Sequence, residues 1–218
     1  MTITIGVLLS GTGTNLQAIL EAIAAKKLDA KIGVVVSNVA SAGGLKRAED
    51  AGVPTVVVDH RQYVSRREFD AKVVSVLEKH GVEWLVLAGF MRVVTERLLD
   101  AFPMRIINIH PSLLPAFTGL NAQQQALTYG ARITGCTVHF VDGGTDTGPI
   151  IAQCAVPVFS KDTDETLRKR VLVQEHLLLV DVLQWVAKGR ITVQPDPKGG
   201  RPRVVISGES PFRGLSES

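Results

Sequence analysis

The stretch from Gly6 to Leu20 reads GVLLSGTGTNLQAIL, and it decides the fold. It begins as an apolar run, breaks at Gly-Thr-Gly-Thr-Asn, and resumes with apolar residues at helical spacing. A glycine-rich turn between a strand and a helix usually faces a phosphate, because backbone N–H groups at a helix N-terminus attract anions. The dinucleotide fingerprint needs a third glycine where Leu16 stands, and the ATP-binding loop needs a lysine that this turn lacks. The stretch therefore predicts a phosphate-binding turn of neither standard type.

The same pattern of strand, turn and helix is repeated along the first 110 residues. Short, continuously apolar runs alternate with segments of helical spacing, which is typical of a parallel sheet covered on both faces by helices. We expect strands at 2–9, 31–37, 54–58, 84–88 and from 105 onward, with helices at 16–26, 44–51, 67–79 and 95–101. This half of the chain is predicted to be a doubly wound, Rossmann-like α/β unit with a mostly parallel sheet.

The second half has a different pattern. Apolar runs at 133–141 and 149–158 follow each other with no helical segment between them, which predicts antiparallel pairing. A helix is expected at 119–129. A long C-terminal helix is expected to begin at the capping pair Asp162 and Glu165 and to end at Gly189.

The domain organisation follows from these elements. We expect one domain over residues 1–195, built from the halves 1–110 and 111–195. Residues 196–218 form a C-terminal tail rich in Gly, Pro, Arg and Ser, and its last ten or so residues are expected to be frayed.

Composition narrows the class of protein. The chain has 218 residues, of which 45% are hydrophobic and 21% charged, as in an ordinary globular domain. A net charge of +3 fits an anionic small ligand and is too weak to indicate nucleic-acid binding. Cys136 and Cys154 lack the spacing of a metal site and are expected to be buried thiols in a reducing compartment. The N-terminus resembles neither a signal peptide nor a membrane span, so we expect a cytoplasmic protein without a membrane partner.

The segment NIHPSLLP carries the strongest candidates for a functional site, because ligands of open α/β sheets bind at the carboxyl ends of the strands. Asn108 and His110 stand two apart, so they point to the same face of a continuing strand. An amide donor and an imidazole at the tip of a buried strand are unfavourable without a partner or a ligand. Alternatively, the two side chains only hold the backbone of the following loop.

The loop DGGTDTGP, residues 142–149, is a second candidate. A carboxylate of Asp142 or Asp146 beside His110 would favour the imidazolium and fix its orientation. The alternative is a turn in which aspartates accept backbone hydrogen bonds.

Other polar residues are ambiguous in the sequence. The segment GFMR, residues 89–92, is either a helix start or a pocket wall. The triplet 174–176, Gln-Glu-His, interrupts an apolar stripe and is more typical of a solvated helix face. His60 and His80 are expected to be solvated, and His139 is expected to be structural or near a site.

Several segments, in this order, resemble the folate-dependent formyltransferases. They are LLSGTGTNLQAIL, VLAGFMRVV, NIHPSLLPAF, GCTVHFVD, DTGPII and VQEHLLL, and the resemblance spans residues 5 to about 180. The most similar branch of the family formylates glycinamide ribonucleotide in purine biosynthesis. The resemblance implies that the ribonucleotide amine attacks the formyl carbon of the co-substrate 10-formyltetrahydrofolate. It also implies a tetrahedral intermediate, with neither a metal nor a covalent enzyme intermediate.

The resemblance further implies roles for individual residues. His110 would be the general acid, Asn108 would donate to the oxyanion, and Asp146 rather than Asp142 would contact His110 and tune its protonation. The phosphate and ribose of the ribonucleotide would be bound by Gly13, Thr14, Asn15 and Glu175. The folate would be bound by Arg66, Met91, Arg92, Val93, Val94 and Asn108.

In these terms, residues 1–110 are the ribonucleotide-binding half, and residues 111–195 are the folate-binding and catalytic half. The expected partners are the two small-molecule substrates and not nucleic acid, and the chain is expected to be a monomer or a homodimer.

The chain also departs from the family pattern. The family motif G-L-H-x-H reads Gly119-Leu120-Asn121-Ala122-Gln123 here, and Leu172 stands where a glutamine is common. These changes leave open a non-catalytic folate- or nucleotide-binding module. A 10-formyltetrahydrofolate deformylase would use the same Asn, His and Asp on water, but it normally carries an N-terminal regulatory domain, and this chain starts on its first strand. A methionyl-tRNA formyltransferase needs a C-terminal domain, for which about 30 residues after the long helix are too few.

Overall fold

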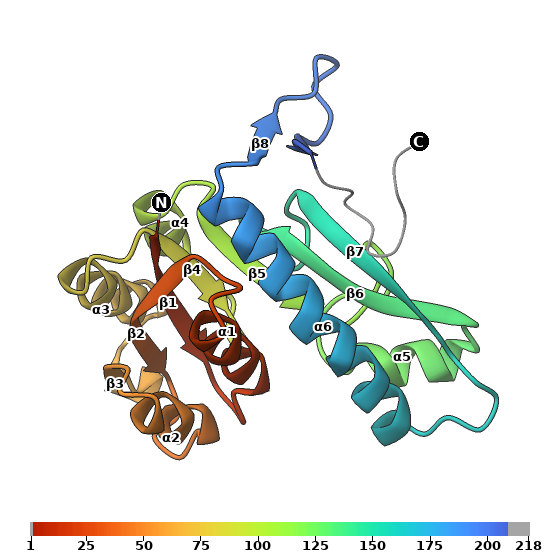
Figure 1. The fold of residues 1–218 in the computed structure, drawn as a ribbon, viewed down its shortest axis with the longest axis horizontal. Coiled ribbons are helices and arrows are strands. Elements are labelled where there is room, and N and C mark those ends of the chain that lie inside the picture. The colour runs from red at the N-terminus through yellow and green to blue at the C-terminus, as the bar shows by residue number, and fades with distance from the viewer. Residues whose placement is uncertain (1, 209–218) are drawn as a thin grey trace. The chain divides into compact units, whose positions relative to one another are not determined.

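The structure is a computed structural model that describes residues 2–208. The chain forms two compact units, Met1–Asn108 and Ile109–Ser218. In the first unit, coloured red to yellow-green in Figure 1, strands and helices alternate as the sequence predicts. Its elements are β1 (Ile3–Leu9), α1 (Thr14–Ala24), β2 (Ala30–Ser37), α2 (Gly43–Asp50), β3 (Thr55–Val57), the 3-10 helix η1 (His60–Gln62), α3 (Arg66–Lys79), β4 (Trp84–Leu87), α4 (Glu96–Ala101) and the first residues of β5 (Ile106–His110).

The strands of the first unit pair in parallel. β1 lies between β2 and β4, β3 adds to β2, and β5 adds to β4. All seven residues of β1 are buried, as a strand covered on both faces requires. Because parallel strands end on the same side, the loops after β1, β2, β3 and β4 lie at one edge of the sheet.

The second unit contains the antiparallel part of the fold. Its elements are α5 (Ala122–Tyr129), β6 (Ile133–Phe140), β7 (Ile150–Pro157), α6 (Asp164–Ala187), β8 (Ile191–Gln194) and β9 (Arg203–Ile206). β6 and β7 pair antiparallel, with Cys136 opposite Cys154, and α6 packs against both strands (Figure 1). The strand order of the seven-stranded sheet is β3-β2-β1-β4-β5-β6-β7. The predicted fold class, a mostly parallel Rossmann-like sheet with an antiparallel C-terminal part and a long C-terminal helix, is confirmed.

The start of α6 differs from the prediction. Asp162 and Glu165 are not the capping pair, because the N-cap is Thr163. The Thr163 hydroxyl accepts a hydrogen bond from the backbone N–H of Thr166 (3.3 Å), and the Thr166 hydroxyl accepts one from the Thr163 N–H (2.9 Å). Asp162 instead accepts two hydrogen bonds of 2.7 Å from Arg170, which hold the pKa of its carboxyl well below the usual range. The predicted cap was one residue early, because aspartate and threonine are both good N-cap residues.

The end of α6 leads into a hairpin that the sequence analysis did not anticipate. The helix ends at Ala187, and Gly189 (φ +64°) follows it in the left-handed conformation, as expected for a terminating glycine. β8 and β9 then pair antiparallel, the Ser207 N–H donates to the Arg190 carbonyl (3.0 Å), and β9 contacts β7. The predicted fraying of the last ten or so residues concerns residues 209–218, which lie outside the described part of the chain.

The helix predicted at 119–129 begins three residues late, at Ala122. Gly119 (φ +77°) and Asn121 (φ +56°) have left-handed backbone conformations, which cannot continue as a right-handed helix. Asparagine is one of the few residues that adopt this conformation readily, so Asn121 suits the turn that starts α5.

Candidate functional site

The site begins at the carboxyl end of β5, where Asn108 and His110 stand two residues apart. Asn108 is half-buried and His110 is buried. The strand consists otherwise of isoleucines, whose apolar side chains fix its place in the core. The two polar residues are therefore held by a rigid element.

Both ring nitrogens of His110 face acceptors within the second unit. Nε2 lies 2.9 Å from the carbonyl oxygen of Phe117, and Nδ1 lies 3.4 Å from Oδ2 of Asp146. A carbonyl oxygen can only accept, so Nε2 carries a proton in this arrangement. The carboxylate on the other side of the ring helps to fix the orientation of the imidazole.

Asp146 is held in place by contacts on both of its oxygens. Oδ2 accepts a hydrogen bond from the Gly119 N–H (2.8 Å), and Oδ1 lies 3.8 Å from Nε2 of His139. The backbone of Asp146 is left-handed (φ +54°), a conformation that aspartate adopts more readily than most residues. A nearly buried carboxylate between two histidines makes Asp146 a candidate for a functional site.

His139 lies on β6 and completes this cluster. Its Nδ1 lies 2.7 Å from the Phe140 carbonyl oxygen. Burial lowers the pKa of His139, and the charge of Asp146 opposes this effect only in part. The sequence left His139 open between a structural role and a place near a site, and its ring lies next to Asp146.

Asp142, the other carboxylate of the loop, has a different environment. Its Oδ1 accepts hydrogen bonds from the Gly144 N–H (3.0 Å) and from the Thr147 hydroxyl (2.6 Å). These bonds fix the turn of the loop that carries Asp146. Of the two aspartates, Asp146 contacts His110 and Asp142 shapes the backbone.

Asn121 and Gln123 stand at the positions where the family motif has histidines, and both fit the local structure. Asn121 occupies the left-handed position before α5, and Gln123 is buried in the first turn of that helix. The neighbouring Gln125 donates to the carbonyl oxygens of Thr118 and Leu120, both at 2.9 Å. The segment is therefore held by amide groups, which do not titrate.

The glycine-rich turn lies in the first unit, where it ends at Gly13 (φ +71°) and α1 begins at Thr14. The N–H groups of Thr14 and Asn15 fall in the first turn of the helix, where backbone donors have no partner within the helix. The turn is fixed from α2: the Gly44 N–H donates to the Gly11 carbonyl (3.1 Å), and Arg47 Nε donates to the Thr12 carbonyl (2.9 Å). The turn that leads into α1 is thus braced from α2.

The contact between Gly13 and Gly44 explains why the turn needs glycine. A Cβ atom on Gly13 would lie 2.5 Å from the Gly44 Cα, and one on Gly44 would collide with Leu9 and lie 3.1 Å from the Gly13 Cα. The loop and α2 approach so closely that a Cβ atom at either position would collide with a neighbour. The sequence analysis missed Arg47 and Gly44, because their roles depend on this approach.

The residues assigned to folate binding in the first unit lie around an aromatic cluster. The Phe69 and Phe90 rings are stacked with centroids 6.4 Å apart, and the Arg92 guanidinium lies 5.0 Å from the Phe69 centroid. Arg66 and Met91 are exposed. Val93 is 48% exposed, whereas the next residue, Val94, is 8% exposed.

A buried carboxylate supports this cluster. Asp70 accepts hydrogen bonds from the backbone N–H (2.6 Å) and the hydroxyl (2.7 Å) of Thr95. Burial raises the pKa of Asp70, while the bonds from Thr95 and the charges of Arg92 and Arg66 oppose the rise. Asp70 thereby anchors the end of the loop that contains residues 91–94.

Glu175 on α6 is buried, so the interpretation of residues 174–176 as a solvated face is wrong for this residue. Burial, followed by the charge of Glu175, raises the pKa of the Cys136 thiol. Cys154 Sγ lies 3.3 Å from Oε1 of the neighbouring Gln174. A buried glutamate on this helix face is compatible with a ligand contact, but hydrophobic spacing alone did not indicate it.

Two structural features concern metals and membranes. Within residues 2–208, no group of three or more His, Cys, Asp or Glu side chains is placed to hold a metal ion. No helix in this described part of the chain is long and apolar enough to cross a membrane.

The fold and site define a class of protein: an α/β protein with a histidine–carboxylate pair near the end of a central strand. Residues 3–183 match the family model described as formyl transferase, and the chain belongs to that family.

Relatives with known names are similar over most of the chain. Phosphoribosylglycinamide formyltransferase of Escherichia coli (strain K12) is 40% identical over 185 residues, which cover 85% of this chain and 87% of the relative. Trifunctional purine biosynthetic protein adenosine-3 of Gallus gallus is 50% identical over 189 residues, or 87% of this chain. This chain spans 19% of the length of that larger protein.

Solved structures with similar folds carry names related to those of these relatives. Glycinamide ribonucleotide transformylase 1 from Symbiobacterium toebii has a TM-score of 0.90 and 50% sequence identity, with 94% of each chain covered. Phosphoribosylglycinamide formyltransferase from Anaplasma phagocytophilum has a TM-score of 0.88 and 39% identity, with 96% of each chain covered. The fold of these two enzymes is thus shared by nearly the whole chain.

Proposed function

We propose that the chain transfers the formyl group of 10-formyltetrahydrofolate to the amine of glycinamide ribonucleotide, a step of purine biosynthesis. The observation that carries the proposal is the cluster of His110, Asp146 and His139, in a chain that belongs to the formyl transferase family. The name of the E. coli relative supports glycinamide ribonucleotide as the formyl acceptor, and that of the trifunctional relative supports a place in purine biosynthesis. A cytoplasmic location, and a monomer or homodimer without nucleic acid, are part of the same proposal.

The reaction would proceed by direct attack. The amine nitrogen forms a bond to the formyl carbon, and the carbonyl electron pair moves to oxygen, where Asn108 would donate a hydrogen bond to the oxyanion. The amine then loses a proton, and the bond between the carbon and N10 of the folate breaks. N10 gains a proton, for which His110 would be the general acid.

The geometry suggests which nitrogen of His110 delivers that proton. Nδ1 faces the Asp146 carboxylate, which orients the ring. Nε2 faces the Phe117 carbonyl. A bond to this neutral acceptor is weaker than one to a carboxylate, so a substrate atom can replace it more easily. We therefore assign the transferred proton to Nε2, so the Phe117 carbonyl would give up this contact when substrate binds.

The substrates would be held by residues outside this cluster. The ribonucleotide phosphate would be bound by the amides at Gly13, Thr14 and Asn15, and Glu175 would contact the ribose or amine side. The folate would contact the backbone of residues 91–94, with the cations of Arg92 and Arg66 available to its glutamate tail.

One assay tests the function. The protein is incubated with 10-formyltetrahydrofolate, with and without glycinamide ribonucleotide, and folate absorbance is followed. We expect turnover only when both are present. Turnover that needs no ribonucleotide would indicate a hydrolase, and no turnover in either mixture would exclude the enzymatic proposal.

His110→Ala tests the site. Loss of a general acid lowers the rate of transfer by about 10²–10⁴-fold, whereas ribonucleotide binding, measured by isothermal titration calorimetry, should persist. Wild-type activity in this variant would remove His110 from the mechanism. His80→Ala is a matched control, since His80 lies at the end of α3 with its Nδ1 2.9 Å from the Val76 carbonyl oxygen.

A further inference from the structure

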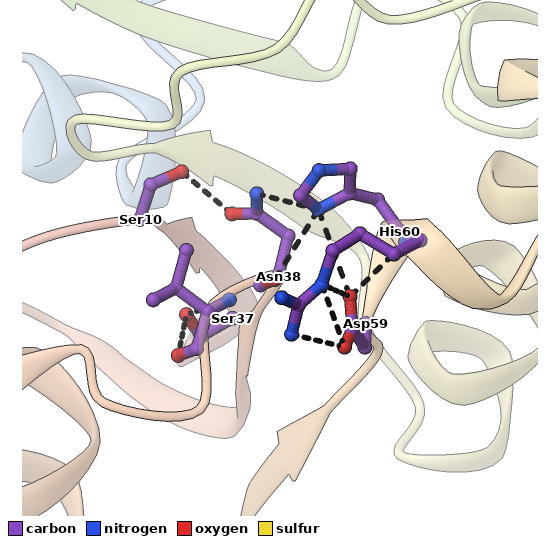
Figure 2. A network of polar contacts seen from close by, with 7 residues as sticks. Ser10, Ser37, Asn38, Asp59 and His60 are labelled. Carbon is purple, nitrogen blue, oxygen red and sulfur yellow. Dashed lines mark hydrogen bonds and ion pairs between the residues drawn. The ribbon is translucent and has the colours of Figure 1, made fainter.

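A chain of polar groups runs along the edge of the sheet where β3, β2, β1 and β4 end (Figure 2). His60 follows β3, Asn38 follows β2, and Ser10 follows β1. The Asn38 Nδ2 lies 3.3 Å from His60 Nδ1, and the Ser10 hydroxyl donates to Asn38 Oδ1 (2.6 Å). The last contact is with the β4 loop, where the Met91 N–H donates to the Ser10 hydroxyl oxygen (2.9 Å). The order of these groups is the order of the strands in the sheet.

The far end of this network of polar groups, beyond His60, is rigid. Asp59 caps η1 by accepting from the Arg61 N–H (3.0 Å), and the Arg61 guanidinium holds the same carboxylate at 2.7 Å. These hydrogen bonds lower the pKa of Asp59 to about 2, so the carboxylate stays charged. His60 is half-buried and contacts Asn38, so its side chain is only partly solvated. The buried Asn38 accepts the hydroxyl proton of Ser10, and this bond orients the Ser10 hydroxyl.

Ser10 holds the β4 loop at two points. Its backbone N–H donates to the Gly89 carbonyl (3.1 Å), and its hydroxyl oxygen accepts from Met91. The single hydroxyl proton is directed to Asn38, so a lone pair of the oxygen is directed to the Met91 N–H. Gly89 (φ +73°) lets the loop turn between these two bonds. Removal of the hydroxyl would release the second point and keep the first.

We propose that Ser10 is a positioning residue that sets the backbone of residues 91–94 for the folate co-substrate. This inference rests on the proposed function, in which that backbone contacts the pterin. Ser10 itself need not touch either substrate. The adjacent phosphate loop is braced separately, through Gly44 to Gly11 and Arg47 to Thr12. Loss of the Ser10 hydroxyl should therefore affect the folate and spare the ribonucleotide.

The test compares Ser10→Ala with Ser10→Thr, which keeps a hydroxyl, and with Ser41→Ala, a change at an exposed serine in the turn after β2. Hydrogen exchange of a peptide covering residues 86–95 reports the Met91 bond directly and needs no activity. Steady-state kinetics then give separate KM values for the two substrates. We expect exchange at this peptide to become about five-fold faster in Ser10→Ala, the equivalent of one hydrogen bond.

We expect the KM for 10-formyltetrahydrofolate to rise by a similar factor of about five, while the KM for the ribonucleotide stays near the wild-type value. Ser10→Thr should restore both measurements, and Ser41→Ala should change neither. Unchanged exchange in Ser10→Ala would overturn the proposed anchor. Equal rises of both KM values, or no rise of either, would overturn its role toward folate. A wild-type protein that fails to transfer formyl groups would contradict the proposed function, while the exchange measurement would still decide the anchor.

Discussion

The close contact between the glycine turn and α2 predicts a large loss of stability in Gly13→Ala. Gly13 has a φ of +71°, and a left-handed conformation costs a residue with a side chain about 1–2 kcal/mol. The added Cβ would also lie 2.5 Å from the Gly44 Cα, a backbone atom that cannot rotate away. Overpacking of this kind costs about 1–3 kcal/mol. The free energy of unfolding should fall by about 2–5 kcal/mol in total.

Urea unfolding followed by circular dichroism measures this loss, and Gly11→Ala is the matched control. Gly11 lies in the same turn, and a Cβ there would meet nothing within 4 Å, so its substitution should change stability by less than about 0.5 kcal/mol. Gly44→Ala should fall between the two, because the nearest obstacle is the flexible Leu9 side chain. A loss below about 1 kcal/mol for Gly13→Ala, or equal losses for Gly11 and Gly13, would refute the steric argument.

Two further predictions concern buried groups in the second unit. Burial lowers the folded-state pKa of His139 below its ordinary value of 6.5, so its neutral form should contribute stability above pH 6.5 that is lost as the pH falls. His139→Gln should reduce the acid dependence of urea stability, by no more than about 1.4 kcal/mol per pH unit, and an identical pH profile would contradict this. Burial also raises the pKa of the Cys136 thiol, so iodoacetamide should label the half-buried Cys154 first and Cys136 only after unfolding. Peptide mass spectrometry checks the order, and equal labelling in the native protein would contradict it.

Much of the fold could be predicted because its strands are buried on both faces. β1 is buried along its whole length and β2 contains a run of three buried valines, and such apolar runs indicate a parallel sheet. Helix boundaries were less predictable where backbone conformation decides them. Asn121 takes a left-handed conformation that its sequence neighbours do not reveal, and α5 therefore starts after it. The β8–β9 hairpin was missed because its strands are short and half-exposed.

In the candidate site, too, some residues could be predicted from local sequence and others only from the folded structure. Asn108, His110 and Asp146 stand in motifs that resemble a known family, and the contact between His110 and Asp146 has the expected partners. Their chemical roles stay predictions. Ser10 and Asn38 could not be identified from sequence, because their contacts form only when parallel strands bring distant residues to one edge. The burial of Glu175 likewise depends on which face of α6 packs inward.

The hairpin that follows α6 has a consequence for the association of whole molecules. β7 is the last strand of the sheet, and such a strand offers unpaired backbone groups to any other strand that approaches. β9 contacts β7, and the hairpin is closed by the bond from Ser207 to Arg190. A chain cut after Gly189 would lose the contact of β9 with this edge strand. Its expected failure is concentration-dependent aggregation through added strands, even with every residue of the His110 cluster intact.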